Sequence, residues 1–131
     1  MNFFEGTLVA QNGSVLFEER ADKGPGFRVP LVEPQAGALR AQVGRSLTLG
    51  LRPEHLRPVT AGDGADGVRA LLERVEAAGS ESLLHLSNGN HTFIARSSDE
   101  PAGKATGPLD LRFDMSQARY FDAVTGVALS E

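Results

Sequence analysis

The chain has 131 residues, of which 40% are hydrophobic and 23% are charged, and its formal net charge is −4. A chain of this length fits one domain, or two very small ones that share a core, and it can bury roughly two-thirds of its unfolded surface without disulfides or metals. The acidic balance argues against tight nonspecific binding to nucleic acid, which depends on neutralising phosphates with cations. It also argues against docking on an anionic lipid surface.

The sequence contains no cysteine, so disulfides and thiolate metal sites are excluded, in agreement with a reducing compartment. No apolar run approaches the ~20 residues of a membrane helix, and the first residues lack the basic-then-apolar pattern of a signal peptide. We therefore expect no direct insertion into a membrane.

The first half of the chain shows the period-two hydrophobicity of β-strands. Two apolar sets alternate with polar or small residues: Phe27, Val29 and Leu31 in one run, and Leu47, Leu49 and Leu51 in the next. This period places each apolar set on one face of a pleated strand. Gly13 and the Gly-Pro-Gly at 24–26 are turn signals between such strands.

The run that ends at Leu51 leads directly into a turn that carries Arg52, Glu54 and His55. Pro53 has no backbone N–H and a fixed φ, so the strand ends there and the residue before proline is held extended. The three side chains then project from a turn on a rigid scaffold, which suits contact with a partner. A purely structural turn, with Arg52 and Glu54 paired or solvated, explains the pattern equally well.

A stretch of small residues divides the chain. Residues 60–67 read Thr-Ala-Gly-Asp-Gly-Ala-Asp-Gly and contain no apolar anchor. We therefore predict a linker over 59–67 between two sub-lobes, about 1–58 and 68–131, within a single domain of 1–131. Asp63 and Asp66 lack the regular acidic spacing and the closing glutamate of a calcium loop, so no metal site is expected there.

Residues 68–78 fit two kinds of secondary structure. Val68, Leu71, Leu72 and Val75 have helical spacing, and the alanine, leucine, glutamate and arginine among them favour helix. A strand-rich context can override that propensity, so a strand is the alternative.

Gly79 suits a positive φ or a bulge between two strands. Glu81 would then project from the bend, where it either hydrogen-bonds across an interface or remains a solvated carboxylate. His85 stands between two leucines and is expected to face outward. Neither His55 nor His91 lies at a zinc-binding spacing from it, so no metal site is expected.

The last third of the chain again has strand periodicity. Three apolar residues alternate with polar ones: Leu109, Leu111 and Phe113. A short helical turn is expected over 116–120. Phe121 and Asp122 are weaker candidates for surface contact, and the core is the expected place of Phe121. Several short strands separated by turn signals predict an all-β fold, either a barrel or a sandwich.

The sequence carries no catalytic constellation. A Gly-x4-Gly-Lys-Ser/Thr phosphate loop is missing, because the nearest fragment, at 103–105, lacks the first glycine and the magnesium-binding hydroxyl. A nucleophile elbow and a cysteine nucleophile are also missing. We therefore predict that this chain is not an enzyme and holds no cofactor or metal of its own.

Four segments of the chain resemble one family: 1–6 (Met-Asn-Phe-Phe-Glu-Gly), 49–56 (Leu-Gly-Leu-Arg-Pro-Glu-His-Leu), 79–86 (Gly-Ser-Glu-Ser-Leu-Leu-His-Leu) and 112–126. Over 1–129 the chain resembles the C-terminal regulatory domain of ATP-binding subunits of sugar-type ABC importers, the maltose and glycerol-3-phosphate kind. This domain is called TOBE, for transport-associated OB-like. Ser82 stands where the family usually has threonine, which keeps the hydroxyl. The resemblance implies two OB-like lobes that share strands, with 68–78 as a strand.

In this family the regulatory domain follows an ATPase domain that binds ATP and magnesium, and this sequence lacks that domain. The resemblance implies a place on the cytoplasmic face of the membrane, with two copies of the subunit joined to permease subunits through the ATPase domains. The regulatory domains would pair across a two-fold axis, hold the subunits together and, in some members, receive cytoplasmic regulatory proteins. The residues expected at such an interface are Arg52, Glu54, His55, Gly79, Glu81, Phe121 and Asp122.

Two other classes of function are alternatives to this one. A small-ligand sensor would bind an oxyanion or a metabolite with clustered backbone N–H groups and Arg52 or Arg96. An oligonucleotide-binding OB module would need aromatic side chains that stack bases on a basic face. The chain has no tryptophan and one tyrosine, so the sensor is the stronger alternative.

Overall fold

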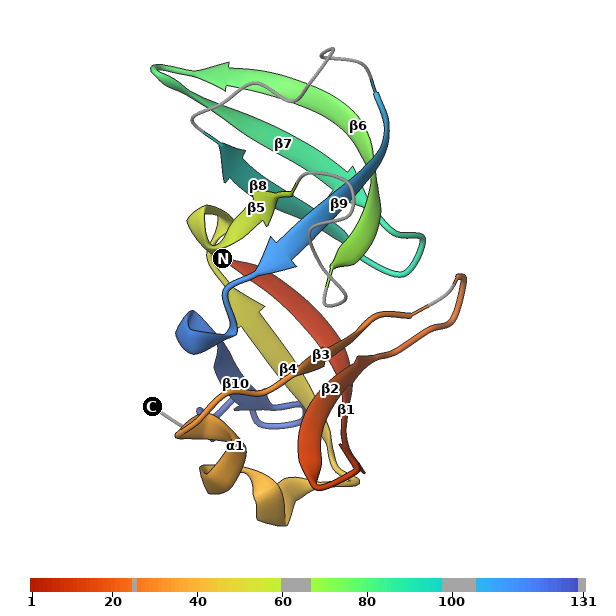
Figure 1. The fold of residues 1–131 in the computed structure, drawn as a ribbon, viewed down its shortest axis with the longest axis vertical. Helices are drawn as coiled ribbons and strands as arrows, with labels where there is room; N and C mark the ends of the chain where they lie inside the picture. The colour runs from red at the N-terminus through yellow and green to blue at the C-terminus, as the bar shows by residue number, and fades with distance from the viewer. Residues whose placement is uncertain (25, 60–66, 98–105, 130–131) are drawn as a thin grey trace.

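The computed structural model describes residues 1–24, 26–59, 67–97 and 106–129, and it confirms the all-β prediction. Its strands form two antiparallel five-stranded sheets, the first in the lower half and the second in the upper half of Figure 1. The first sheet has the order β10 (Arg119–Asp122), β4 (Ser46–Leu51), β1 (Asn2–Gln11), β2 (Ser14–Glu19) and β3 (Arg28–Pro30). The second has the order β5 (Leu56–Pro58), β9 (Gly107–Phe113), β6 (Val68–Ala78), β7 (Glu81–Ser87) and β8 (Thr92–Ser97).

Short helical segments connect some of the strands: α1 (Gln35–Ala38) and the 3₁₀ turns η1 (Arg40–Gln42), η2 (Pro53–His55) and η4 (Met115–Gln117). The helical turn expected over 116–120 is η4, and it ends earlier because β10 begins at Arg119. In the described ranges no helix has the length and apolar character needed to cross a membrane.

The β1–β2 hairpin follows from its two-residue loop. Asn12 and Gly13 both have positive φ, 51° and 81°. Asparagine and glycine are the residues that tolerate this geometry, and the resulting turn matches the right-handed twist of the flanking strands. This turn fixes the register of β1 with β2, in which Gln11 is opposite Ser14 and Gly6 is opposite Glu19.

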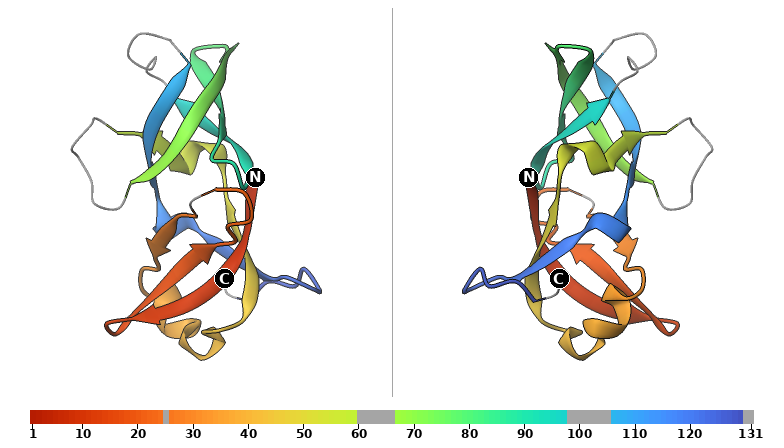
Figure 2. Two further views of the ribbon diagram at one scale, coloured as in Figure 1. Left: turned by 90° about the vertical axis from the view of Figure 1, so that its right-hand side faces the viewer. Right: turned by 90° about the vertical axis from the view of Figure 1, so that its left-hand side faces the viewer.

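The second sheet curls into a nearly closed barrel. Its edge strands are β5 and β8, and these two lie against one another, with η2 also packed on β8. This arrangement covers two sheet edges that would otherwise be exposed. Seen from the sides in Figure 2, the first sheet is more open, and the turn after β10 projects from it.

Each sheet contains strands from both sides of the 59–67 stretch or directly next to it. The division between the sheets therefore does not fall at 59–67 in the sequence, where it was expected. β5 precedes that stretch in the sequence yet belongs to the second sheet, and β10 returns from the C-terminal part to pair with β4 of the first sheet. The stretch joins β5 and β6, both strands of the second sheet, and its residues 60–66 lie outside the described part of the chain. A run of small residues predicts a loop. It does not predict which of the two sheets contains the next strand.

A single hydrophobic core serves both sheets. At its centre the ring of Phe4 on β1 lies 5.4 Å from Phe27, 5.1 Å from Phe93 on β8 and 5.5 Å from Phe113 on β9, measured between centroids. Such aromatic pairs add to the free energy of area burial. The alternating residues of 47–51 and 109–113 face the interior as predicted: Leu47, Leu49, Leu51, Leu111 and Phe113 are buried, and Leu109 is partly buried at the edge of the core.

Residues 68–78 form a strand, as the family resemblance implies. Val68, Ala70 and Leu72 alternate into the core, and pairing with both β7 and β9 overrides the helical propensity. Beyond a register shift between Leu72 and Arg74 the strand leaves the core, and its last residues are exposed.

A buried polar cluster, formed by Glu19, Asn88 and His91, joins the two sheets. The Glu19 side chain has no exposed surface, and its carboxylate accepts hydrogen bonds from the Phe27 N–H (3.2 Å), Asn88 Nδ2 (2.6 Å) and His91 Nδ1 (2.5 Å). His91 Nε2 in turn accepts from the Glu5 N–H at 3.1 Å, which assigns the proton of the neutral ring to Nδ1. A buried carboxylate needs such compensation.

Candidate interaction surface

The turn at Arg52–His55 is a rigid connection between the two sheets. Arg52 is extended (φ −76°, ψ 153°), as expected before proline, and Pro53 begins η2. The His55 N–H donates to the Arg52 carbonyl at 3.0 Å, and the Asp114 N–H donates to the His55 carbonyl at 2.9 Å. The side chains of Arg52 and Glu54 are exposed, whereas His55 is half-buried.

The β6–β7 turn depends on Gly79, whose φ of +71° confirms the predicted positive value. Here glycine avoids the steric cost that any Cβ would bring. Glu81, just after the turn, pairs with Arg96 on β8, with 3.7 Å between Oε1 and Nε. Both side chains are more than two-fifths exposed, so the pair adds little stability.

Arg96 also acts on Glu54. The pKa of Glu54 is lowered, mainly by a hydrogen bond from its own backbone N–H, and the guanidinium groups of Arg96 and Arg52 lower it further. η2, which carries Glu54, packs on β8, which carries Arg96. We call Glu54, Glu81 and Arg96 the Arg96 cluster. Arg96 reaches this position through the β7–β8 register, which sets it opposite Leu83. No local sequence signal specifies that register.

Phe121 does not lie in the core, so that expectation was wrong. Tyr120 is the fully buried residue of β10, and strand alternation turns Phe121 to the outer face. There its ring meets Phe3 edge-on, 6.0 Å between centroids, above Gly50. We call Met1, Phe3, Gly50 and Phe121 the aromatic patch.

Of the four residues in this patch, only Phe121 was predicted from the sequence as a candidate for surface contact. Phe3 is 55% exposed and Met1 46% exposed. The alternation of β1 is the signal that would have found Phe3, because Phe4 is buried and its neighbour must face outward. Gly50 leaves the space for the patch, since a Cβ there would lie 2.9 Å from Met1 Sδ and 3.0 Å from Phe121 Cε2.

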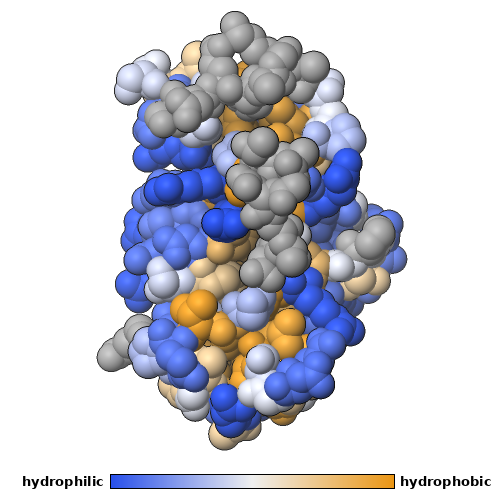
Figure 3. Space-filling model, in the orientation of Figure 1, coloured by the Kyte–Doolittle hydropathy of each residue, from blue (hydrophilic) through white to orange (hydrophobic). Residues whose placement is uncertain are grey.

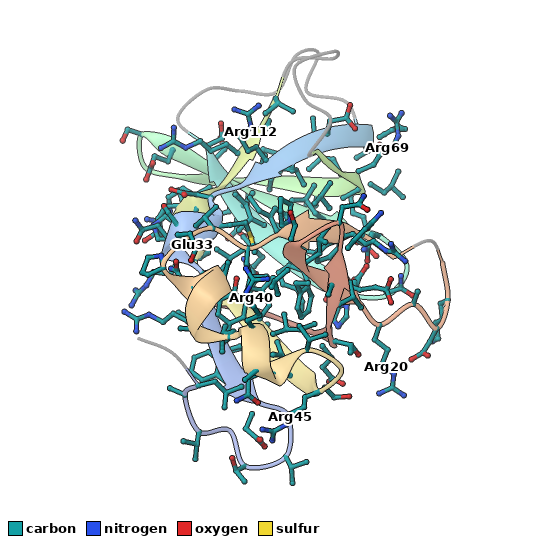
Figure 4. The ribbon with its side chains drawn as sticks, turned by 60° about the horizontal axis from the view of Figure 1, so that its bottom comes forward. Arg20, Glu33, Arg40, Arg45, Arg69 and Arg112 are labelled. Carbon is teal, nitrogen blue, oxygen red and sulfur yellow. The ribbon has the colours of Figure 1, made fainter. Side chains whose placement is uncertain are left out.

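The Asp122 side chain stabilises the turn that directly follows it in the sequence. Its Oδ1 accepts from the Val124 and Thr125 N–H groups, each at 2.8 Å, and its Oδ2 lies 3.0 Å from Nη2 of Arg45, which is labelled in Figure 4. The Thr125 and Val124 N–H groups lower the pKa of this carboxyl. These contacts indicate a structural role for Asp122.

The remaining histidines have local partners. His85 Nε2 lies 2.9 Å from Glu76 Oε1, and His91 belongs to the buried polar cluster. Within the described ranges no group of three histidine, cysteine, aspartate or glutamate side chains is placed to hold a metal ion.

Two family models match the chain. One describes the MalK OB fold domain and covers residues 1–56, and the other describes the TOBE domain and covers residues 49–121. The trehalose/maltose import ATP-binding protein MalK of Thermococcus litoralis is 34% identical over 98% of this chain and 34% of its own length. The sn-glycerol-3-phosphate import ATP-binding protein UgpC of Yersinia pestis is 31% identical over 98% of this chain and 32% of its own length. The chain therefore spans about a third of the length of these relatives.

A solved structure has a similar fold. ModG, described as a cytoplasmic molybdate-binding protein and solved with molybdate bound, matches with a TM-score of 0.61 over 96% of this chain and 95% of its own. The sequence identity is 13%, so this likeness shows the fold alone.

Proposed function

Because the chain belongs to the TOBE domain family, we propose that it is the regulatory and dimerisation domain of an importer's ATP-binding subunit. The two relatives are named as import ATP-binding proteins, for trehalose/maltose and for sn-glycerol-3-phosphate, and each aligns with nearly all of this chain. The proposed solute is accordingly a sugar, a polyol or glycerol 3-phosphate. On this proposal ATP and magnesium bind a separate ATPase domain, and the chain itself acts by binding.

The proposed location is the cytoplasmic face of the membrane, in a transporter complex. A second copy of the subunit is the proposed partner of this chain, and permease subunits are reached through the ATPase domain. Cytoplasmic regulatory proteins are further candidate partners.

The Arg96 cluster is the observation that carries this proposal. A two-fold interface brings the same surface of each copy together, so that surface must be complementary to itself. Glu54, Glu81 and Arg96 present both signs of charge on exposed or half-exposed side chains, with Arg52 beside them. The carboxylates of one copy can then face the guanidinium groups of the other. The aromatic patch is a candidate apolar part of the same interface.

Sensing of an oxyanion or metabolite remains a second candidate function. ModG, whose fold is similar, is described as binding molybdate. Arg96, one of the two arginines expected at such a site, already pairs with Glu81, which favours a role in pairing instead.

Sedimentation velocity across a range of concentrations tests the pairing. We expect a monomer–dimer equilibrium, weak because the isolated chain lacks the high effective concentration that a transporter would provide. Glu81→Arg should weaken the dimer, since it reverses a charge in the Arg96 cluster. Glu73→Arg is the matched control, because Glu73 is exposed on β6 outside the cluster.

Two outcomes would contradict the proposal. One is a strict monomer at millimolar concentration. The other is a dimer that Glu81→Arg weakens no more than Glu73→Arg does.

A further inference from the structure

Two of the four asparagines in the chain precede a glycine: Asn12 precedes Gly13, and Asn88 precedes Gly89. In such a pair the backbone nitrogen of the glycine can attack the side-chain amide of the asparagine, and glycine hinders this attack least because it has no Cβ. Asparagine is one of the thermolabile residues of proteins. Whether each pair reacts in the folded chain depends on how firmly the structure holds its two reacting groups.

Both reacting groups of the first pair are unrestrained. Asn12 and Gly13 form the exposed two-residue loop of the β1–β2 hairpin, near the lower end of the molecule in Figure 1. Across the described ranges, neither the Asn12 side chain nor the Gly13 N–H makes a hydrogen bond. Arg40 donates a hydrogen bond to this loop, but its Nη1 meets the Gly13 carbonyl, at 3.2 Å, and leaves both reacting groups free.

The space around this loop is open. A Cβ placed on Gly13 would have no heavy atom within 4 Å apart from those of its neighbours in the chain. Figure 3 shows hydrophilic surface along the lower right edge of the same face. Water and dissolved base therefore have access to the Asn12–Gly13 pair.

The second pair has the same two residues, but each reacting group has a hydrogen-bond partner. Asn88 Nδ2 donates to the buried Glu19 carboxylate at 2.6 Å, and Asn88 Oδ1 accepts from the backbone N–H groups two and three residues further on, at 3.1 and 3.0 Å. The Gly89 N–H donates to Ser87 Oγ at 3.2 Å. Attack by the Gly89 nitrogen therefore requires the buried polar cluster to open first.

We infer that Asn12 is a site of spontaneous deamidation in the folded protein and that Asn88 is protected from this reaction. A base from solvent removes the Gly13 amide proton, and the Gly13 nitrogen forms a bond with Cγ of Asn12. The Cγ–Nδ2 bond then breaks, and ammonia leaves with a proton returned by solvent. Water opens the resulting succinimide ring at Cγ to give aspartate, or at the backbone carbonyl to give isoaspartate. The net change is the uptake of one water and the loss of one ammonia.

Isoaspartate at position 12 would disturb the first sheet. The main chain then passes through the former side chain, which adds one carbon to a loop whose length fixes the register of β1 with β2. β1 also pairs with β4, so the change affects a central strand of the sheet. We expect the product to be less stable than the parent chain. The inference needs neither a second copy nor a solute, so it is independent of the proposed function.

Peptide mapping by mass spectrometry, after ageing at mildly alkaline pH, measures both sites in one sample. Trypsin cuts after Arg20, Arg74 and Arg96, which places the two sites on separate peptides, 1–20 and 75–96. In the folded chain Asn12 should convert at least about tenfold faster than Asn88, because breaking one hydrogen bond to a buried carboxylate already reduces the reactive population by about that factor. In guanidinium chloride, which unfolds the chain, the two rates should agree within about twofold, since the hydrogen bonds are gone.

Thermal unfolding of the aged protein tests the consequence for the fold. The fraction that contains isoaspartate at position 12 should have a lower Tm than the unaged chain. Asn12→Gly is the matched variant, because glycine accepts the positive φ of this position (51°) and has no amide to lose. Its Tm should not change on ageing.

Three results would overturn the inference. The first is that Asn12 converts no faster than Asn88 in the folded chain. The second is that the same difference between the two sites persists in guanidinium chloride, which would assign it to local sequence rather than to hydrogen bonding. The third is that Asn12→Gly loses as much Tm on ageing as the parent chain, which would place the damage elsewhere.

Discussion

Glu19→Gln should destabilise the protein strongly although it changes a single atom. All three groups that reach the Glu19 carboxylate are donors: the Phe27 N–H, the Asn88 amide and His91 Nδ1. A glutamine offers one acceptor oxygen, and its amide nitrogen would meet an N–H. The ring of His91 cannot adapt by moving its proton, because its Nε2 accepts from the Glu5 N–H. At least one buried donor therefore loses its partner.

The expected loss is about 2–3 kcal/mol in the free energy of unfolding, the cost of one buried unsatisfied donor next to a lost charged acceptor. For a chain of this size that corresponds to roughly 10 °C in Tm. Urea denaturation followed by circular dichroism measures it. Glu18→Gln is the control, since Glu18 is 36% exposed in its surface pair with Arg28, and it should cost less than about 1 kcal/mol. Equal stability of the two variants would refute the argument that the buried polar cluster holds the sheets together.

Three further outcomes are expected. Leu49→Ala should cost about 2–5 kcal/mol in urea denaturation, because Leu49 is fully buried, whereas the partly buried Leu109 should cost less when truncated. Asp122 has a lowered pKa in the folded state, so its stabilising effect should be present at neutral pH and be lost as the pH falls through that pKa. The Tm of Asp122→Ala should therefore fall less on acidification than the Tm of the parent chain. Magnesium-dependent phosphate release from ATP should be absent in a clean preparation, because the sequence has no phosphate loop; release that a point mutation in this chain abolishes would contradict this.

The local parts of the fold were predictable from the sequence. Alternation in 47–51 identified β4 and its buried face, and Asn12–Gly13 contains the chemistry of a tight hairpin. The inward face of a short strand is harder to predict. In the four residues of β10, Tyr120 and Phe121 are both apolar aromatic candidates for the core, and only the pairing of β10 with β4 decides between them.

The non-local parts were not predictable, because they depend on register between distant strands. Glu19 is a charged residue that composition alone would place at the surface, yet it is buried by partners 69 and 72 residues away. Arg57 opposite Arg112 and Arg96 beside Glu81 follow in the same way from strand pairing. The sequence identified Glu54 and Glu81 separately, and the structure adds Arg96, which pairs with Glu81 on a strand that packs against η2.

The return of β10 to β4 has a consequence for biosynthesis. β4 ends at Leu51, but the strand that covers its outer edge begins only at Arg119. On the ribosome, the first sheet therefore keeps one edge open until residues 119–122 have emerged, while the second sheet can already assemble from 56–113. An open edge is a template for pairing with other chains. Nascent copies of this domain should consequently be most vulnerable to mispairing in the interval before the last strand is released.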